Sequence, residues 1–274
     1  MSVLLHISDT HFGTEQPEVV EALLRLAARE PVDVVLWSGD ITQRATAAEF
    51  AAARDFGERL RAPALRVIPG NHDIPLFDLL ARATRPYAQF SRAFGPELEP
   101  EYAGPDVLVV MLNTTRTWRH RDGEVSAAQL QRSAARLASA GPGQLRVVVV
   151  HQPVGVLVPS DRHNLMHGHE AAVQAWQAAG ADLVLGGHIH LPYVMALGRG
   201  DGLWAVQAGT AVSRRRRSGL PNSVNLIRYQ AAEHDRHCTV ERWDFLTGEG
   251  EFRQQACTRL ALRPHDAEGV GAPE

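Results

Sequence analysis

The chain has 274 residues, of which 45% are hydrophobic and 22% are charged, which is typical of a folded globular protein and excludes general disorder. Its 28 basic residues, all arginine, stand against 31 acidic residues and give a net charge of -3. The chain therefore lacks an overall basic field that would attract nucleic acid or an anionic membrane.

Short apolar runs alternate with longer helical patterns through the first two thirds of the chain. Six runs rich in Val, Leu and Ile predict buried strands over 3–8, 33–38, 64–69, 107–112, 145–150 and 182–187. Helices are predicted between them over 17–29, 46–61, 126–140 and 168–179. Ser126 and Gln129 have the spacing of a capping box at the start of the third helix. Such alternation indicates an α/β fold with helices covering the faces of a sheet.

After residue 191 the pattern changes to strands alone, predicted over 193–198, 203–208, 223–229 and 238–245. We expect a second, mostly antiparallel sheet that packs on the first. Residues 84–106 contain four prolines and are predicted to form an irregular insert at the border of a substrate cleft. We expect a single domain over 1–264 and a disordered tail over 265–274.

Polar side chains stand at the ends of five predicted strands. The carboxyl edge of an α/β sheet is where ligands bind, because strand ends and their loops converge there. Taken singly, each of these residues is typical of a helix cap, a turn or a polar loop. Their repetition at five strand ends favours a common site instead. The candidate residues are Asp9, His11, Asp40, Asn71, His72, Asp73, His151, His188 and His190.

The residue types at these positions indicate divalent metal ions. Carboxylate and amide oxygens mixed with imidazoles suit Mn, Fe, Co or Zn, whereas Ca and Mg sites contain mostly oxygen. Seven ligands from among these nine residues are too many for one ion and fit two ions that share a carboxylate. Two ions about 3.5 to 4 Å apart stabilise the attacking and leaving oxygens of a phosphoryl displacement.

Five short motifs also resemble a known family. DTH (9–11), GD (39–40), GNHD (70–73), a His after a Val-rich strand (151) and GHIH (187–190) are similar in order and spacing to the signature of the calcineurin-like metallophosphoesterases. Bacterial cyclic-nucleotide phosphodiesterases are the more similar group, from GNHDIPLF and from AGTAVS followed by PNSVNLI. The resemblance implies a four-layer α/β sandwich, in which helices flank two mixed β-sheets.

The resemblance also implies a role for each motif residue. Asp9, His11 and His190 would hold one metal ion, Asp40 would bridge, and Asn71, His151 and His188 would hold the second. His72 would face the substrate and protonate the leaving oxygen, and Asp73 would orient His72 or a ligand. The implied activity is hydrolysis of a phosphodiester, with cyclic nucleotides as candidates, by a hydroxide bound to a dinuclear centre of Mn, Fe or Zn.

Departures from the pattern narrow the choice within the family. Protein Ser/Thr phosphatases carry GDxVDRG and GNHE, whereas this chain has GDITQRA and GNHD, which disfavours that class. Gln152 stands where many relatives have a second His, a change expected to alter the surroundings of the metal site and leave its ligands intact. A metal-dependent nuclease, a pyrophosphatase acting on a nucleotide-linked lipid and a catalytically silent metal-binding scaffold remain alternatives.

Other features favour ordinary structural roles. His163, His167 and His169 fit a polar loop better than a separate metal site. The arginines at 214–217 are typical of a solvated loop; the alternative is that one or two of them, or Arg116, contact the substrate.

The cysteines and the apolar runs bear on compartment and partners. Two cysteines without CxxC spacing, no basic leader and no apolar run near 18 residues favour a cytoplasmic protein. The expected partner is a small phosphate ester, with no stable nucleic-acid partner and no membrane, and the sequence leaves the oligomeric state open.

Overall fold

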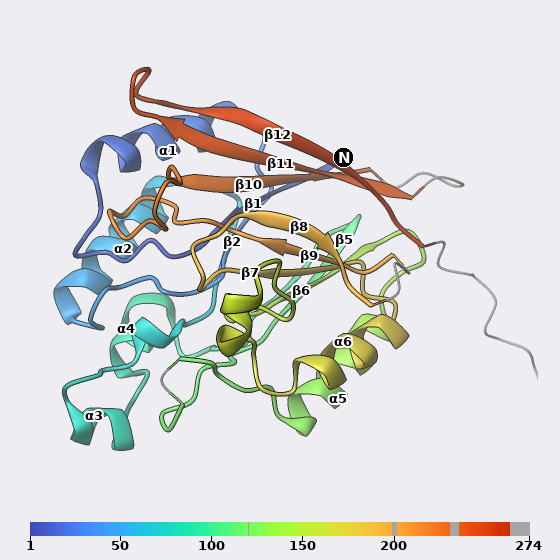
Figure 1. Ribbon diagram of the computed structural model, residues 1–274, viewed down its shortest axis with the longest axis horizontal. Helices are drawn as coiled ribbons and strands as arrows, with labels where there is room; N and C mark the ends of the chain where they lie inside the picture. Colours follow the sequence, from blue (N-terminus) through green and yellow to red (C-terminus); the bar gives the residue numbers. More distant parts are fainter. Residues whose placement is uncertain (120, 199–201, 231–235, 264–274) are drawn as a thin grey trace, which may run out of the picture.

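Two six-stranded β-sheets form the centre of the protein (Figure 1). The computed structural model describes residues 1–119, 121–198, 202–230 and 236–263. In spatial order the first sheet consists of β12 (Glu251–Ala261), β11 (His237–Leu246), β10 (Ser223–Tyr229), β1 (Ser2–Ile7), β2 (Val34–Trp37) and β3 (Ala64–Val67). The second sheet consists of β4 (Glu101–Ala103), β5 (Val107–Met111), β6 (Leu145–Val149), β7 (Leu183–Gly186), β9 (Trp204–Gln207) and β8 (Tyr193–Ala196).

Both sheets are mixed, and each combines early and late strands of the chain. In the first sheet β1, β2 and β3 are parallel, and β10, β11 and β12 continue the sheet antiparallel from β1. In the second sheet β5, β6, β7 and β9 are parallel, and β4 and β8 are antiparallel edge strands. The predicted fold class is therefore confirmed. The prediction that the strands after residue 191 form a sheet of their own is wrong, because β8 and β9 extend one sheet and β10 to β12 extend the other.

Alternation along the strands produces four layers. In β1 the side chains of Val3, Leu5 and Ile7 pack outward with the first group of helices, whereas Leu4 points between the sheets. In β5 Val107, Val109 and Met111 point between the sheets, and Leu108 and Val110 face the second group of helices. Successive strand residues point to opposite faces, so strands buried on both faces read as the continuous apolar runs seen in the sequence.

Six α-helices are present in the part of the chain that the structure describes: α1 (Pro17–Arg29), α2 (Ala47–Arg59), α3 (Leu79–Thr84), α4 (Ala88–Phe94), α5 (Ala127–Ala138) and α6 (His169–Ala178). Two 3₁₀ turns, η1 (Asn71–Asp73) and η2 (Pro159–Asn164), lie in the loops. Buried residues of α1, α2 and α4 cover the outer face of the first sheet, and those of α5 and α6 cover the second sheet. The Ser126 and Gln129 capping box of α5 is present as predicted.

Two regions differ from the sequence prediction. Residues 84–106, expected to be irregular, contain the end of α3, all of α4 and strand β4. Strand β12 was missed because its sequence EFRQQACTRLA has no apolar run, and most of its residues are exposed at the sheet edge. The predicted disordered tail, 265–274, lies outside the described residues. None of the helices that the structure describes is long and apolar enough to cross a membrane.

Candidate metal centre

The polar motifs meet where the carboxyl ends of two sheets face each other. His151, after β6, donates a hydrogen bond from Nδ1 to the carbonyl oxygen of Ser38, after β2, at 2.8 Å. The backbone N–H of His188, after β7, donates to Asp9 Oδ2, after β1, at 2.9 Å. The predicted common edge is therefore formed by two sheets instead of one, since β1 to β3 belong to the first sheet and β6 and β7 to the second.

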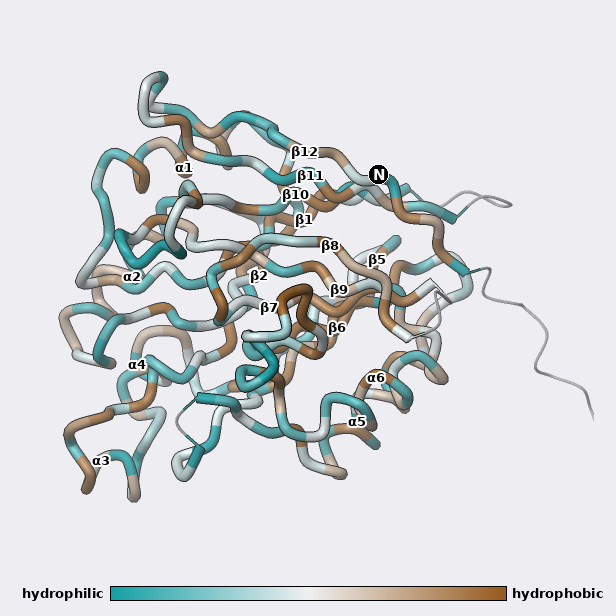
Figure 2. Tube along the Cα trace, viewed as in Figure 1, coloured by the Kyte–Doolittle hydropathy of each residue, from teal (hydrophilic) through white to brown (hydrophobic). Residues whose placement is uncertain are grey.

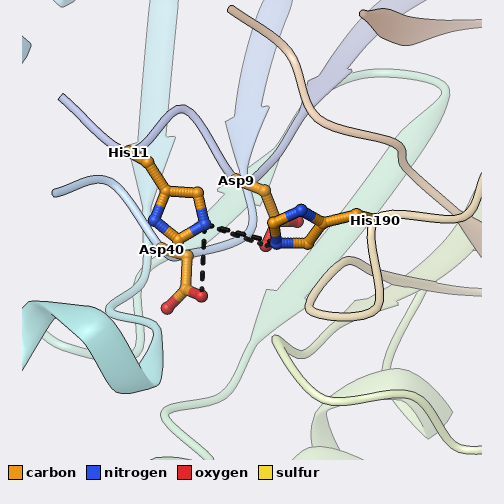
Figure 3. A group of neighbouring side chains, drawn as sticks. All are labelled: Asp9, His11, Asp40 and His190. Carbon is orange, nitrogen blue, oxygen red and sulfur yellow. Dashed lines mark hydrogen bonds and ion pairs between the residues drawn. The ribbon is translucent and has the colours of Figure 1, made fainter. Parts of the chain in front are cut away.

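A first cluster contains Asp9, His11, Asp40 and His190, whose potential ligand atoms all lie within 4.8 Å of one another (Figure 3). His190 Nε2 is 3.2 Å from Asp9 Oδ1. His11 Nε2 is 3.7 Å from Asp40 Oδ2 and 3.3 Å from His190 Nε2. Two carboxylates and two imidazoles thus point their polar atoms into one small volume.

A second cluster contains Asp40, His151 and His188, again with ligand atoms within 4.8 Å of one another. His151 Nε2 is 3.2 Å from Asp40 Oδ1 and 3.1 Å from Asn71 Oδ1. The rings of His151 and His188 pack edge to face with their centroids 5.1 Å apart. Asp40 belongs to both clusters, because Oδ2 faces His11 and Oδ1 faces His151.

The orientation of the side chains fits metal ligands. A carbonyl oxygen only accepts hydrogen bonds, so Nδ1 of His151 carries the hydrogen that binds Ser38, and Nε2 is left to face the cluster. His190 is held in the same way by the carbonyl oxygen of Arg215. His188 Nδ1 is buried without a hydrogen-bond partner, and the buried Asp9 Oδ1 faces the imidazoles of His190 and His11 at 3.2 and 3.8 Å. Buried polar atoms in native proteins are almost always satisfied, and a cation would satisfy these.

The electrostatics of the clusters favour cations as well. Burial lowers the pKa of His11 and of His188 to about 3, so both rings are neutral and can donate a lone pair. Burial alone would raise the pKa of Asp40, but His151 outweighs it and holds that pKa well below its ordinary value. Burial alone would lower the pKa of His151, but Asp40 raises it to about 9. Buried carboxylates are thus balanced by imidazolium protons that a metal ion can replace.

The backbone at the site is strained. Asp9, His11, Asp40, His188 and His190 have φ values between +42° and +74°, the left-handed region. Only two further non-glycine residues of the described chain have a positive φ. This conformation costs roughly 1 to 2 kcal/mol per L-residue, and strain of this kind gathers at functional sites.

Two glycines of the motifs are required by close packing. A Cβ atom on Gly70 would lie 2.1 Å from Asp40 N, and one on Gly187 would lie 1.9 Å from Ser8 Oγ and 2.4 Å from Asp9 Oδ2. Gly70 therefore passes the backbone of Asp40, and Gly187 passes the side chains of Ser8 and Asp9, more closely than any larger residue allows. GNHD and GHIH consequently need their glycines for space.

Asp73 and His72 lie beside the clusters. The buried carboxylate of Asp73 accepts hydrogen bonds from the backbone N–H groups of Ile41, Thr42 and Gly70, at 2.8 to 3.0 Å, which joins the loop after Asp40 to the loop of Asn71. Burial and the nearby Asp40 raise the pKa of Asp73 to about 6. Through these contacts Asp73 holds together the two loops that carry the candidate ligands Asp40 and Asn71.

The ring of His72 packs edge to face on His11, with centroids 4.9 Å apart, and its backbone N–H donates to Asp40 Oδ1 at 2.9 Å. Gln43 contributes a contact that the sequence did not indicate: its carbonyl oxygen lies 3.0 Å from His72 Nδ1. Nothing in the letters ITQ distinguishes such a residue from an ordinary loop position.

The remaining sequence candidates lie in supporting positions. Gln152 is buried and accepts a hydrogen bond from Thr114, so it supports the loop after β5. Arg116 donates to the carbonyl oxygens of Asn113 and Thr115 and to Gln129, which ties that loop to α5. His167 pairs with Asp122 at the surface.

A family model now tests the resemblance. The model for calcineurin-like phosphoesterases matches residues 2–192, which include all five motifs. The chain belongs to the calcineurin-like phosphoesterase family. No curated protein matches the sequence significantly. The predicted family is thus confirmed, and the narrower likeness to cyclic-nucleotide phosphodiesterases stays a prediction.

Solved structures share this fold at low sequence identity. The purple acid phosphatase PPD1 of yellow lupin (Lupinus luteus) has a TM-score of 0.68 and 11% identity over 95% of this chain and 54% of its own, so this chain spans about half its length. A dimetal phosphatase from Danio rerio has a TM-score of 0.65 and 15% identity over 96% of this chain and 99% of its own. Vps29 of Chaetomium thermophilum has a TM-score of 0.53 and 13% identity over the full length of both chains. At these identities the likeness shows the fold alone.

Proposed function

We propose that the protein is a metal-dependent hydrolase that cleaves small phosphodiesters, with cyclic nucleotides as candidate substrates. One observation carries the proposal: Asp40 directs one carboxylate oxygen into each of two ligand clusters. The oxygen and imidazole donors of both clusters suit Mn, Fe or Zn. In this assignment the first cluster would hold one ion, His151, His188 and Asn71 would hold the second, and both clusters would share Asp40.

Two divalent ions, when bound, would lower the pKa of a water molecule and neutralise negative charge on the phosphoryl oxygens. The chain itself supplies the geometry. The backbone N–H of His72 donates to Asp40 Oδ1, which fixes the backbone of His72 relative to the shared carboxylate. Such fixed placement is the main protein contribution to phosphoryl transfer.

His72 is assigned to the proton transfer to the leaving oxygen. Its Nδ1 donates to the carbonyl oxygen of Gln43, because a carbonyl only accepts, and this bond holds the ring throughout the reaction. Nε2 is then the nitrogen left to deliver the proton, once a substrate oxygen separates it from the Arg215 guanidinium 3.1 Å away. The ring of His11 at 4.9 Å restricts its rotation from one side.

The test is a panel of phosphodiesters and monoesters assayed with added Mn²⁺, including 3',5'-cyclic and 2',3'-cyclic nucleotides. We expect turnover of at least one diester by the unchanged protein, and loss of that turnover in Asp40→Asn and in His72→Asn. Equal turnover in Asp40→Asn would contradict the proposal. Two bound metal ions without turnover of any substrate would favour the metal-binding scaffold.

A pyrophosphatase for a nucleotide-linked lipid is a second candidate, favoured by one observation. Leu76, Phe77, Leu79 and Leu80 lie shortly after η1, where α3 begins, and are exposed, Phe77 to 79%. Figure 2 shows this hydrophobic stretch in brown beside the α3 label. Arg82 Nε donates to the carbonyl oxygen of Thr117 at 2.8 Å, next to an exposed Trp118. An apolar surface beside a phosphoesterase site suits an acyl chain. Cleavage of a nucleoside diphosphate lipid in detergent, with no cleavage of small diesters, would support this candidate.

A further inference from the structure

One guanidinium of the arginine loop reaches the metal centre. Arg215 Nη1 lies 3.1 Å from His72 Nε2 and 3.1 Å from Gln43 Oε1. The adjacent arginines are engaged elsewhere or exposed: Arg217 Nη1 pairs with Asp161 Oδ2 at 2.9 Å, and Arg216 donates to the carbonyl oxygen of Leu220. Among the arginines at 214–217, Arg215 therefore differs from the other three because its guanidinium contacts His72 at the metal centre.

The backbone of Arg215 is held at the site independently of its side chain. Its carbonyl oxygen accepts hydrogen bonds from His190 Nδ1 and, at 2.9 Å, from Thr210 Oγ1. Its N–H donates to Ser213 Oγ at 3.2 Å. The guanidinium is thus mounted on the same segment that orients a candidate metal ligand, and a substitution of the side chain leaves these backbone bonds in place.

The charge of Arg215 is not balanced by a carboxylate. Within the residues that the structure describes, the contacts of its half-buried guanidinium are the Gln43 amide and the His72 ring, and it forms no ion pair. Partial burial of a cation without an anion is unfavourable. An anionic oxygen at this position would remove that cost, and the guanidinium geometry matches phosphate oxygens.

Arg215 and His72 converge on the same small region. Arg215 Nη1 lies 3.1 Å from His72 Nε2 and 3.4 Å from His72 Nδ1, so the guanidinium lies beside the ring and close to Nε2, the nitrogen that the bond from Nδ1 to Gln43 leaves for the leaving oxygen. A phosphoryl group between the clusters and His72 therefore brings one of its oxygens to Arg215. We propose that Arg215 binds a non-bridging oxygen of the scissile phosphoryl group, so that the site selects esters with an anionic phosphoryl oxygen. This proposal rests on the proposed function.

Binding of inorganic phosphate to the Mn²⁺-loaded protein, measured by calorimetry, tests the proposal without relying on turnover. We expect Arg215→Gln to weaken phosphate binding about tenfold to a hundredfold, the range for a charge-assisted hydrogen bond. Arg215→Lys keeps the positive charge and loses the planar guanidinium, so its affinity for phosphate should lie between those of Arg215→Gln and the unchanged protein. Metal content and the thermal unfolding midpoint should stay as in the unchanged protein, because the backbone contact to His190 persists.

Arg214→Gln is the matched control. Arg214 is exposed, lies in the same loop, and has no side-chain hydrogen bond or ion pair to the rest of the described chain, so its replacement should leave phosphate affinity unchanged. Equal phosphate affinity in Arg215→Gln and the unchanged protein would overturn the proposal while leaving phosphodiester hydrolysis untouched. Loss of metal from Arg215→Gln would also overturn it, because the residue would then act through His190. Weaker phosphate binding by a protein that cleaves no ester would support the anion site and refute the proposed reaction.

Discussion

Replacing Gly187 by alanine adds a single methyl group to the metal centre and changes none of its candidate ligands. The new Cβ would lie 1.9 Å from Ser8 Oγ and 2.4 Å from Asp9 Oδ2. A Cβ atom essentially never comes within 3.0 Å of a non-bonded heavy atom, so Ser8 Oγ must move by about 1.1 Å and Asp9 Oδ2 by about 0.6 Å. Overpacking of this size costs about 1 to 3 kcal/mol of the free energy of unfolding. A shift of that order also moves Asp9 relative to His190.

We expect Gly187→Ala to fold and to bind Mn²⁺ at least about tenfold more weakly, as found when the support of a metal ligand is removed. Calorimetric titration with Mn²⁺ and thermal unfolding measure the two effects. Gly248→Ala is the control, because its Cβ would meet no atom within 4 Å and the residue lies in the turn between β11 and β12. Wild-type Mn²⁺ affinity in Gly187→Ala would refute the close approach of GHIH to Asp9.

Three further predictions concern the ions. Asp40→Ala or Asn71→Ala should lose most of the bound metal and nearly all activity, whereas His72→Ala should keep the metal and lose turnover. Elemental analysis and an activity assay measure the two effects. Metal retained in Asp40→Ala would contradict the shared carboxylate. Because the pKa of His151 is raised to about 9, metal binding at pH 7 must displace its proton. The affinity for Mn²⁺ should therefore rise from pH 7 to pH 9. An affinity that does not change with pH would contradict this proton displacement. Chelation should lower the unfolding midpoint, since ions at a hundredfold excess over their Kd add about 2.7 kcal/mol per site, and a midpoint unchanged by chelator would contradict it.

Much of the fold was predictable because both sheets are buried on two faces. Strands such as 107–111 and 145–149 read as continuous apolar runs bounded by turn residues, and their positions follow from that pattern alone. The sequence pattern does not show in the same way which of the two sheets a strand joins. Strand β10 pairs with β1 across more than 200 residues, and the alternation within 223–229 would fit either sheet.

The candidate site was visible because several chemically unusual residues end successive strands. The sequence could not show which residues support them. Gln43 acts through its carbonyl oxygen and Thr42 through its backbone N–H, and a backbone group leaves no trace in a residue letter. Arg215 differs from its three arginine neighbours only through the direction of its side chain, which depends on the fold around it.

Anomalous diffraction from crystals grown with Mn²⁺ tests the central claim, that the five motifs hold two ions around one shared carboxylate. We predict two peaks about 3.5 to 4 Å apart, one beside Asp9, His11 and His190 and the other beside Asn71, His151 and His188, with Asp40 contacting both. A single peak, or peaks remote from Asp40, would contradict the account.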